Sequence, residues 1–336
     1  METLCNTLKN KNMEKSVPQI LITGANGFLA TNIIEQLLED KIKVRAQLRR
    51  RPAFRLPADM WERSGLLEIA ECDFTKSETM KALVQGCDYV IHVAAVTDPS
   101  LLKYEDYSRI NADAVRNLIE ASVEAGVKRF IFVSSANVFG YGTKEKPGDE
   151  SQPVSPPFDR SLYAQSKIEG QNLAMSYSGR IEIVSVNPTF MIGKYGDKNG
   201  SNRIITRAGK LSKNKRKRLI FVPPGGKNFI NVENAAREII RLLYKGKNGQ
   251  AYLVSGENLS YVEFYKLLKN VTVANFRIVK IPVPAMLIAG AAGSMLRLAG
   301  VKCPLSFVNA RILCVSNFYT NKTQDLAKIF ETLSNS

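Results

Sequence analysis

The sequence predicts an α/β protein, in which a doubly wound parallel sheet is followed by a smaller C-terminal substrate lobe. The first part of the chain alternates short β-branched apolar runs with amphipathic stretches, the pattern of parallel strands joined by helices. A glycine-punctuated turn follows the first apolar run, and the alternation loosens after Pro188. A chain of 336 residues that is 45% hydrophobic is long enough for such a core.

The elements of the first part follow from this alternation. Strands are expected at Gln19–Thr23, Lys43–Leu48, Leu66–Glu71, Tyr89–Ala94, Arg129–Ser134 and Ile181–Asn187. Helices are expected where apolar residues recur three and four apart, at Asn26–Glu39, Tyr104–Ala125 and Arg160–Ser176. Together they predict a domain over residues 17–188. Residues 1–16 are polar and lysine-rich, without the apolar run of a secretory signal, and are expected to form a disordered tail.

Residues 189–336 are expected to form most of the substrate lobe, with some segments returning to the sheet. Helices are predicted at Val232–Tyr244 and at Tyr261–Lys269, the second with Ser260 as its N-cap, and strands at Ala251–Val254 and Arg277–Val283. Ligands of open α/β folds bind outside the carboxyl ends of the strands. The lobe is therefore expected to cover that edge of the sheet.

The turn after the first strand has the chemistry of a phosphate-binding site. It has the sequence Thr23-Gly24-Ala-Asn26-Gly27-Phe28-Leu29-Ala30. A glycine at position 24 permits a tight turn, Gly27 lets backbone N–H groups approach a pyrophosphate, and a small Ala30 permits close packing at the positive end of the helix. The alternative is an ordinary strand–helix turn.

This turn and several later motifs resemble the extended short-chain dehydrogenase/reductase family, which includes nucleotide-sugar epimerases and dihydroflavonol reductases. The resemblance runs from about Gln19 to beyond Ala251, and Ala30 departs from the third glycine of many members. Its other motifs are Cys72-Asp73-Phe74, expected near the adenine, His92-Val-Ala94-Ala95, Asn111 and Tyr163-Ala-Gln-Ser-Lys167. It implies a Rossmann-type domain that holds a dinucleotide through Gly24, Asn26, Gly27, Phe28, Leu29, Asp73, Phe74, Ala94, Ala95, Tyr163, Lys167 and Pro188.

Tyr163 and Lys167 are four residues apart, so on a helix they share one face. A nearby ammonium favours the phenolate of a tyrosine, which must exchange a proton near neutral pH. The resemblance assigns Lys167 to this role and to the cofactor ribose, and it makes Ser135 the residue that hydrogen-bonds the substrate oxygen. The alternatives are an exposed helical pair and, for the neighbouring Ser134, a hydroxyl that satisfies backbone groups.

The end of the second strand predicts the cofactor. NAD enzymes usually place a carboxylate there, whereas this chain has Arg49, Arg50 and Arg51. A guanidinium can pair with a 2′-phosphate, so NADP(H) is expected through Arg49, with Arg50 as a helper and NAD(H) as the alternative. The alternative interpretation of the arginines is a solvated loop on an already basic protein. His92 is expected to have a structural role.

The segment Phe229-Ile-Asn-Val232-Glu-Asn resembles the 3β-hydroxysteroid dehydrogenase and dihydroflavonol reductase branch. The predicted function is therefore an NADP(H)-dependent ketone reductase or secondary alcohol dehydrogenase that acts on a medium-sized, largely apolar substrate. Two alternatives remain. Lys227 stands where nucleotide-sugar epimerases carry a phosphate-binding arginine, which keeps an epimerase open. A non-catalytic dinucleotide sensor is the other.

Charge and composition predict the partners. The net charge is +16, and the densest basic run comprises Lys213, Lys215, Arg216, Lys217 and Arg218. No nucleic-acid-binding motif accompanies this run, so the protein is not expected to bind nucleic acid. The five cysteines have no metal-ligand spacing, which predicts no metal site and reduced thiols in a cytoplasmic protein. The apolar stretch Met286–Leu298 is expected to close the substrate lobe or a homodimer interface, with peripheral membrane contact as the less favoured alternative.

Overall fold

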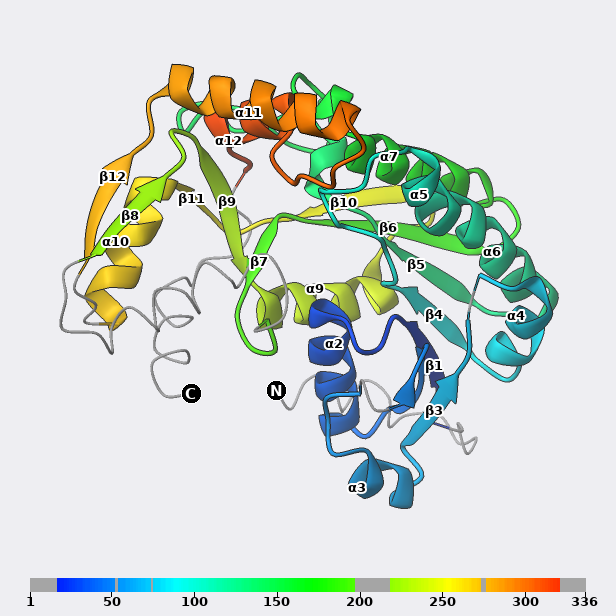
Figure 1. The fold of residues 1–336 in the computed structure, drawn as a ribbon. Coiled ribbons are helices and arrows are strands. Elements are labelled where there is room, and N and C mark those ends of the chain that lie inside the picture. The colour runs from blue at the N-terminus through cyan, green and yellow to red at the C-terminus, as the bar shows by residue number, and fades with distance from the viewer. Residues whose placement is uncertain (1–16, 52–53, 74, 197–217, 273–275, 321–336) are drawn as a thin grey trace.

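The computed structural model describes residues 17–51, 54–73, 75–196, 218–272 and 276–320, and its centre is a seven-stranded sheet (Figure 1). The strands are β1 (Gln19–Thr23), β2 (Lys43–Leu48), β3 (Leu67–Glu71), β4 (Tyr89–His92), β5 (Arg129–Val133), β6 (Glu182–Pro188) and β10 (Gln250–Val254). Their order is β10-β6-β5-β4-β1-β2-β3, and every pair of neighbours is parallel. The predicted Rossmann-type α/β fold is confirmed.

Helices cover both faces of the sheet because its strands are apolar on both sides. In β1, Ile20 and Ile22 belong to the core of one face and Leu21 to the core of the other. The first face carries α2 (Phe28–Glu39) and α9 (Val232–Lys245). The second carries α4 (Ser77–Val84), α6 (Ala114–Glu124) and α7 (Leu162–Ser176). The short helices α3 (Ala58–Arg63) and α5 (Glu105–Ser108) lie at the periphery (Figure 1).

The chain beyond residue 188 contributes to both the sheet and the lobe. Helix α9 packs beside α2, and β10 pairs with β6 at the edge of the main sheet. The lobe comprises β7 (Phe190–Ile192), β8 (Arg218–Val222), β9 (Gly226–Asn231), β11 (Glu257–Ser260), β12 (Phe276–Lys280), β13 (Ser316–Asn317), α10 (Tyr261–Thr272), α11 (Val283–Leu298) and α12 (Phe307–Cys314). Figure 1 shows these elements on the side of the sheet where β6 and β10 lie.

Strand β9 organises the lobe. It pairs with β7, β11 and β13, while β8 pairs with β12 in a separate two-stranded unit. The ring of Phe229 in β9 stacks on Phe264 in α10 at 4.4 Å between centroids, which joins the two elements. The predicted N-cap of α10 is confirmed: Ser260 Oγ accepts from the Glu263 N–H, and the Glu263 carboxylate accepts from the Ser260 N–H.

Three predicted elements are corrected. Strand β4 ends at His92 instead of Ala94, because the N–H groups of Val93 and Ala94 donate to the Thr23 hydroxyl. The helix predicted over Tyr104–Ala125 contains a π-helical turn at Arg109–Asp113, between α5 and α6. The predicted strand at Arg277–Val283 is β12, which ends at Lys280 before Pro282 caps α11.

The apolar stretch predicted from the sequence forms α11, but two of its residues do not close the lobe. Ile288 and Leu298 are 71% and 90% exposed. Within the described residues, no helix is both long and apolar enough to cross a membrane. The predicted tail at 1–16, Phe74 and the basic residues 213–217 lie outside the described residues.

Candidate functional site

The glycine turn has the shape that a dinucleotide requires. Gly24 has φ +68°, and a Cβ there would lie 2.9 Å from the Ala94 Cα, so only glycine fits. The Gly27 N–H donates to Gly24 O at 2.8 Å, and a Cβ on Gly27 would lie 2.9 Å from that oxygen. Helix α2 begins immediately after Gly27 without a side-chain cap. Its first N–H groups are thus available for an anion, and the turn fits a pyrophosphate.

Two buried polar side chains hold this turn, and the sequence analysis did not single them out. Thr23 Oγ1 accepts from the N–H groups of Val93 and Ala94 at 3.2 Å each. Gln47 Oε1 accepts from the Gly24 N–H at 3.1 Å, while its Nε2 donates to Cys72 O at 2.7 Å. The carboxyl ends of β1, β2, β3 and β4 are thereby joined. The sequence signal that could have identified them is a polar residue at the carboxyl end of an otherwise apolar strand.

The expected adenosine end of the site lies beside β2 and β3. Arg49 directly follows β2 and is exposed, and Arg51 pairs with Glu62. The Asp73 carboxylate accepts from the Thr75 hydroxyl and N–H, which lower its pKa, and the charge of Arg49 adds to this effect. Arg49 and Asp73 are therefore neighbours. In the turn itself, Asn26 is exposed and Phe28 and Leu29 are buried.

The three predicted catalytic residues gather where β5 ends and α7 begins. The Ser135 side chain lies close to the Tyr163 hydroxyl. Its polar contact lowers the tyrosine pKa, but burial has the larger effect, and the pKa is raised. Lys167 is 1% exposed, and its Nζ donates to Val133 O at 2.7 Å. Burial lowers the pKa of Lys167 to about 7. Ser135, Tyr163 and Lys167 therefore lie at the junction of β5 and α7, and their catalytic roles stay a prediction.

The backbone around Ser135 is fixed by hydrogen bonds. Ser135 Oγ accepts from the Asn137 N–H at 3.2 Å, and the Ser135 carbonyl accepts from Asn187 Nδ2 at 3.1 Å. The neighbouring Ser134 donates its backbone N–H to Val186 O at 2.7 Å. Its buried hydroxyl has no hydrogen-bond partner among the described residues, so the backbone-satisfying role considered for that hydroxyl is not observed.

The π-helical turn positions α7. Asn111 in this turn accepts from the Val96 N–H at 2.8 Å and donates from Nδ2 to Ser166 Oγ at 3.0 Å. A Cβ on Gly170 of α7 would lie 2.0 Å from Asn111 O, so the two elements meet backbone to backbone. π-Helical turns are frequent at functional sites. Here the turn connects the loop after β4 with the helix that carries Tyr163.

His92 has the structural role expected from the sequence. It is 1% exposed and stacks on Phe132 with ring centroids 6.0 Å apart. Burial, with a smaller effect from Lys167, lowers its pKa to about 3. Its Nδ1 lies 2.8 Å from the Thr23 hydroxyl. Since that hydroxyl already accepts two N–H bonds, its proton points to Nδ1, and His92 is neutral.

The chain leaves the site through Pro188 at the end of β6 and enters the lobe. Thr189 Oγ1 donates to Asn228 Oδ1 at 2.7 Å, which aligns β7 with β9. Beside this link, Lys227 Nζ lies 5.5 Å from the centre of the Phe190 ring, and burial lowers the lysine pKa to about 8. A cation therefore lies at the base of the lobe, at the position that the sequence analysis considered as a possible phosphate-binding residue.

Comparisons with known proteins agree with this architecture. Residues 20–255 match the NAD dependent epimerase/dehydratase family. A 3-beta-hydroxysteroid dehydrogenase from Mycolicibacterium neoaurum is 27% identical over 184 residues, which are 52% of this chain and 48% of that protein. 3beta-Hydroxysteroid-dehydrogenase/decarboxylase isoform 1 from Arabidopsis thaliana is 29% identical over 343 residues, covering 91% of this chain and 74% of that protein. This chain thus spans about half of the mycobacterial relative.

Solved structures share the fold. UDP-glucose 4-epimerase from Thermotoga maritima, with UDP-glucose, superposes with a TM-score of 0.67 at 19% identity, over 79% of this chain and 85% of that one. The structure of MoeE5 in complex with UDP-glucose and NAD gives a TM-score of 0.69 at 20% identity, over 94% of this chain and 97% of that one. The family match covers the whole glycine turn, the Ser135–Tyr163–Lys167 group and β10. This chain therefore belongs to the NAD-dependent epimerase/dehydratase family, within the extended short-chain dehydrogenases/reductases.

Proposed function

We propose that this protein is an NADP(H)-dependent oxidoreductase that interconverts a ketone and a secondary alcohol on a medium-sized, largely apolar molecule. The observation that carries the proposal is the closeness of the Ser135 and Tyr163 side chains, which influences the tyrosine pKa, with Lys167 one helical turn further along α7. This group can exchange a proton with a substrate oxygen. A sensor that only binds dinucleotides needs none of the three residues.

Each residue has a defined role in the proposed reaction. In the reductive direction, Tyr163 gives its hydroxyl proton to the substrate oxygen, and Ser135 donates a hydrogen bond to the same oxygen as negative charge develops there. In the oxidative direction, Tyr163 takes the proton back. A protonated Lys167 favours the phenolate form of Tyr163. The glycine turn would hold the pyrophosphate of a dinucleotide, whose nicotinamide would supply or accept the hydride.

The NADP(H) preference is supported by the end of β2. Arg49 is exposed at the position where a carboxylate would meet the 2′-hydroxyl of NAD(H). Arg51 is engaged by Glu62, which leaves Arg49 as the best-placed guanidinium for a 2′-phosphate. Asp73 is its neighbour, but that carboxylate is already occupied by Thr75.

An apolar ketone or alcohol is supported by two observations. Curated relatives with the names of 3-beta-hydroxysteroid dehydrogenases match this chain, one of them over 91% of its length. After Ser135 the chain continues with Ala136 and Asn137, so the acids expected of the dehydratases of the family are missing from this turn. Elimination of water needs an acid or base there, whereas hydride transfer does not.

The second candidate is a nucleotide-sugar epimerase. Lys227 favours it, because a partly buried cation at the base of the lobe suits the phosphate of a nucleotide sugar. An epimerase returns the hydride to the same substrate. A product of changed stereochemistry, formed without net consumption of NADPH, would select this candidate.

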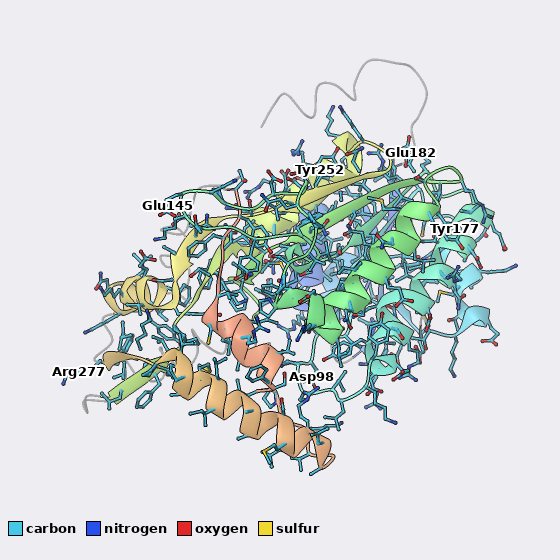
Figure 2. The ribbon with its side chains drawn as sticks, turned by 90° about the horizontal axis from the view of Figure 1, so that it is seen from above. Asp98, Glu145, Tyr177, Glu182, Tyr252 and Arg277 are labelled. Carbon is cyan, nitrogen blue, oxygen red and sulfur yellow. The ribbon has the colours of Figure 1, made fainter. Side chains whose placement is uncertain are left out.

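The decisive experiment compares Tyr163→Phe with Tyr177→Phe in a screen of NADPH oxidation. The substrates are ketosteroids, flavonoid ketones and acyl ketones, with nucleotide sugars as the contrasting set. Loss of the Tyr163 proton donor is expected to lower kcat by about 10²- to 10⁴-fold with NADPH binding retained. Tyr177 is a matched control, because it caps the far end of α7 and its hydroxyl bonds Glu120 (Figure 2).

Two results would contradict the proposal. Full turnover by Tyr163→Phe would remove the phenol from the chemistry. The protein would instead be a dinucleotide sensor if the wild type bound NADPH but turned over no member of either substrate set, and if Tyr163→Phe kept its biological activity.

A further inference from the structure

Helix α11 packs on the molecule by one narrow face. This face consists of Met286, Gly290, Gly293 and Arg297, which recur at helical spacing and are less exposed than their neighbours. A Cβ on Gly290 would lie 2.4 Å from the Cβ of Ala310 in α12, and one on Gly293 would lie 1.7 Å from Leu305 O. The rotation of α11 about its axis is therefore fixed by the glycines.

The opposite face of α11 is apolar and exposed. Ile288 and Met295 are each 71% exposed, Leu298 is 90% exposed and Leu296 is 50% exposed. Figures 1 and 2 show α11 along the outer edge of the molecule, with α12 on its inner side. Among the described residues nothing covers these side chains. Large apolar side chains gathered on one exposed helix face indicate an interaction surface.

The sequence segment that contains this face carries only positive charges. From Phe264 to Gln324 the sequence contains no Asp or Glu, while its basic residues are Lys266, Lys269, Arg277, Lys280, Arg297, Lys302, Arg311 and Lys322. Lys280 and Lys302 are exposed just before and just after α11. Asp98, in the loop after β4, is an acid near the C-terminal end of α11, and Lys302 helps to lower its pKa (Figure 2).

We propose that α11 docks on an anionic lipid surface, with Ile288, Met295 and Leu298 entering the headgroup layer. The flanking lysines then meet lipid phosphates and carboxylates, which is the arrangement of interfacial helices. With 16 residues the helix is about 24 Å long, and it lies along the protein, so it rests in the interface and does not cross it.

A second copy of the chain fits the exposed face of α11 less well than an anionic membrane does. In a two-fold dimer the same patch lies opposite itself. Lys280 and Lys302 of each copy would then approach the other copy's basic residues, and the segment offers no acid to compensate. An anionic membrane gives both the apolar layer and the opposite charge.

The docked helix is connected to the candidate site. Arg297 donates to Pro99 O at 3.0 Å and also to Leu101 O, in the loop that follows β4 and contains Ala94 and Ala95. A lipophilic ketone leaving the bilayer would enter beside this loop. This last point rests on the proposed function, whereas the docking itself does not.

Vesicle flotation of the full chain tests the docking. The vesicles contain phosphatidylserine and phosphatidylcholine, or phosphatidylcholine alone, at low salt. Floating with the anionic vesicles and release by salt are expected. Met295→Asp is expected to lower the bound fraction at least about tenfold, because a methionine side chain no longer enters the lipid. Met60→Asp on α3 is the matched control, since Met60 is 53% exposed far from α11.

Three outcomes overturn the docking: the protein stays with the soluble fraction at low salt, Met295→Asp floats as well as Met60→Asp, or sedimentation shows a dimer that Met295→Asp dissociates. Unchanged thermal unfolding of both variants confirms that they fold. Turnover of a water-soluble ketone is measured in parallel. Flotation without turnover rejects the proposed function alone, and turnover without flotation rejects the docking alone.

Discussion

Lys167 shows how burial sets the chemistry of a single side chain in this molecule. Its Nζ donates to a carbonyl, Val133 O, and burial alone lowers its pKa to about 7. Near neutral pH the side chain is therefore present both as an amine and as an ammonium. The charge that favours the Tyr163 phenolate increases as the pH falls through 7. The raised pKa of Tyr163 has the same origin, because burial disfavours its charged form.

His92 predicts an acid sensitivity of folding. It is the one histidine of the chain, and its folded pKa of about 3 lies below the ordinary 6.5. Between these two pH values the unfolded state binds a proton that the folded state does not. The contribution of His92 to the free energy of unfolding is therefore fully present above pH 6.5 and is lost as the pH falls towards 3. The free energy of unfolding is expected to fall by about 2 kcal/mol between pH 7 and pH 5, as measured by urea titration.

The control is His92→Asn, which keeps a hydrogen-bonding group beside Thr23 and cannot titrate. It is expected to be less stable at pH 7 but to lose the dependence on pH in this range. An equal slope in both proteins would show that His92 accepts a proton in the folded state without cost.

At the scale of elements, α7 and the π-helical turn form one unit that holds the catalytic tyrosine. Gly170→Ala is expected to destabilise the protein by roughly 1–3 kcal/mol, because the added Cβ would overlap the Asn111 carbonyl at 2.0 Å. The greater helix propensity of alanine offsets only about 1 kcal/mol of this. Thermal unfolding measures the loss, and a fall in kcat would report the displacement of Tyr163.

Gly179→Ala is the matched control for this substitution. A Cβ at Gly179 meets nothing within 4 Å, so its stability is expected to stay within about 0.5 kcal/mol of the wild type. If Gly170→Ala proved equally harmless, the close contact between α7 and the π-helical turn would not contribute to stability.

The sequence predicts the sheet well because its strands carry local signals. The bounds of β1 and β2 agree with prediction, since apolar runs end there at glycine or charged residues. Ser135, Tyr163 and Lys167 also lie at one junction, because a strand end and a helix face fix their spacing, while their catalytic roles stay a prediction. These features depend on neighbours in the sequence.

The rest depends on contacts between distant residues. The end of β4 is set by the Thr23 hydroxyl, and the π-helical turn by its contact with Gly170. The strands β7 and β13 are short, and β9 lacks alternation, so tertiary pairing defines them. Helix α11 is apolar around much of its circumference, and only its glycine contacts show which side faces outward.

At the scale of the whole molecule, cofactor binding is expected to stabilise the fold, because only the folded sheet presents the glycine turn. At 100 times its Kd, NADPH is expected to add about 2.7 kcal/mol and to raise the Tm. At equal concentration NADH is expected to raise it less, since it lacks the 2′-phosphate. Differential scanning fluorimetry measures both shifts.

Arg49→Ala is the test of this difference. It is expected to reduce the shift with NADPH to that with NADH, while the exposed Arg63→Ala on α3 keeps the preference. A larger shift with NADH in the wild type would assign NAD(H) as the cofactor.

The place of β10 in the main sheet has a consequence for biosynthesis. When the ribosome has released the chain as far as Pro188, six strands are present, and β6, with Ile183, Val184 and Val186 destined for the core, ends the sheet as an open edge. The strand that pairs with this edge is translated only after the first lobe strands. During that interval the nascent polypeptide exposes an unpaired strand edge, which is prone to aggregation.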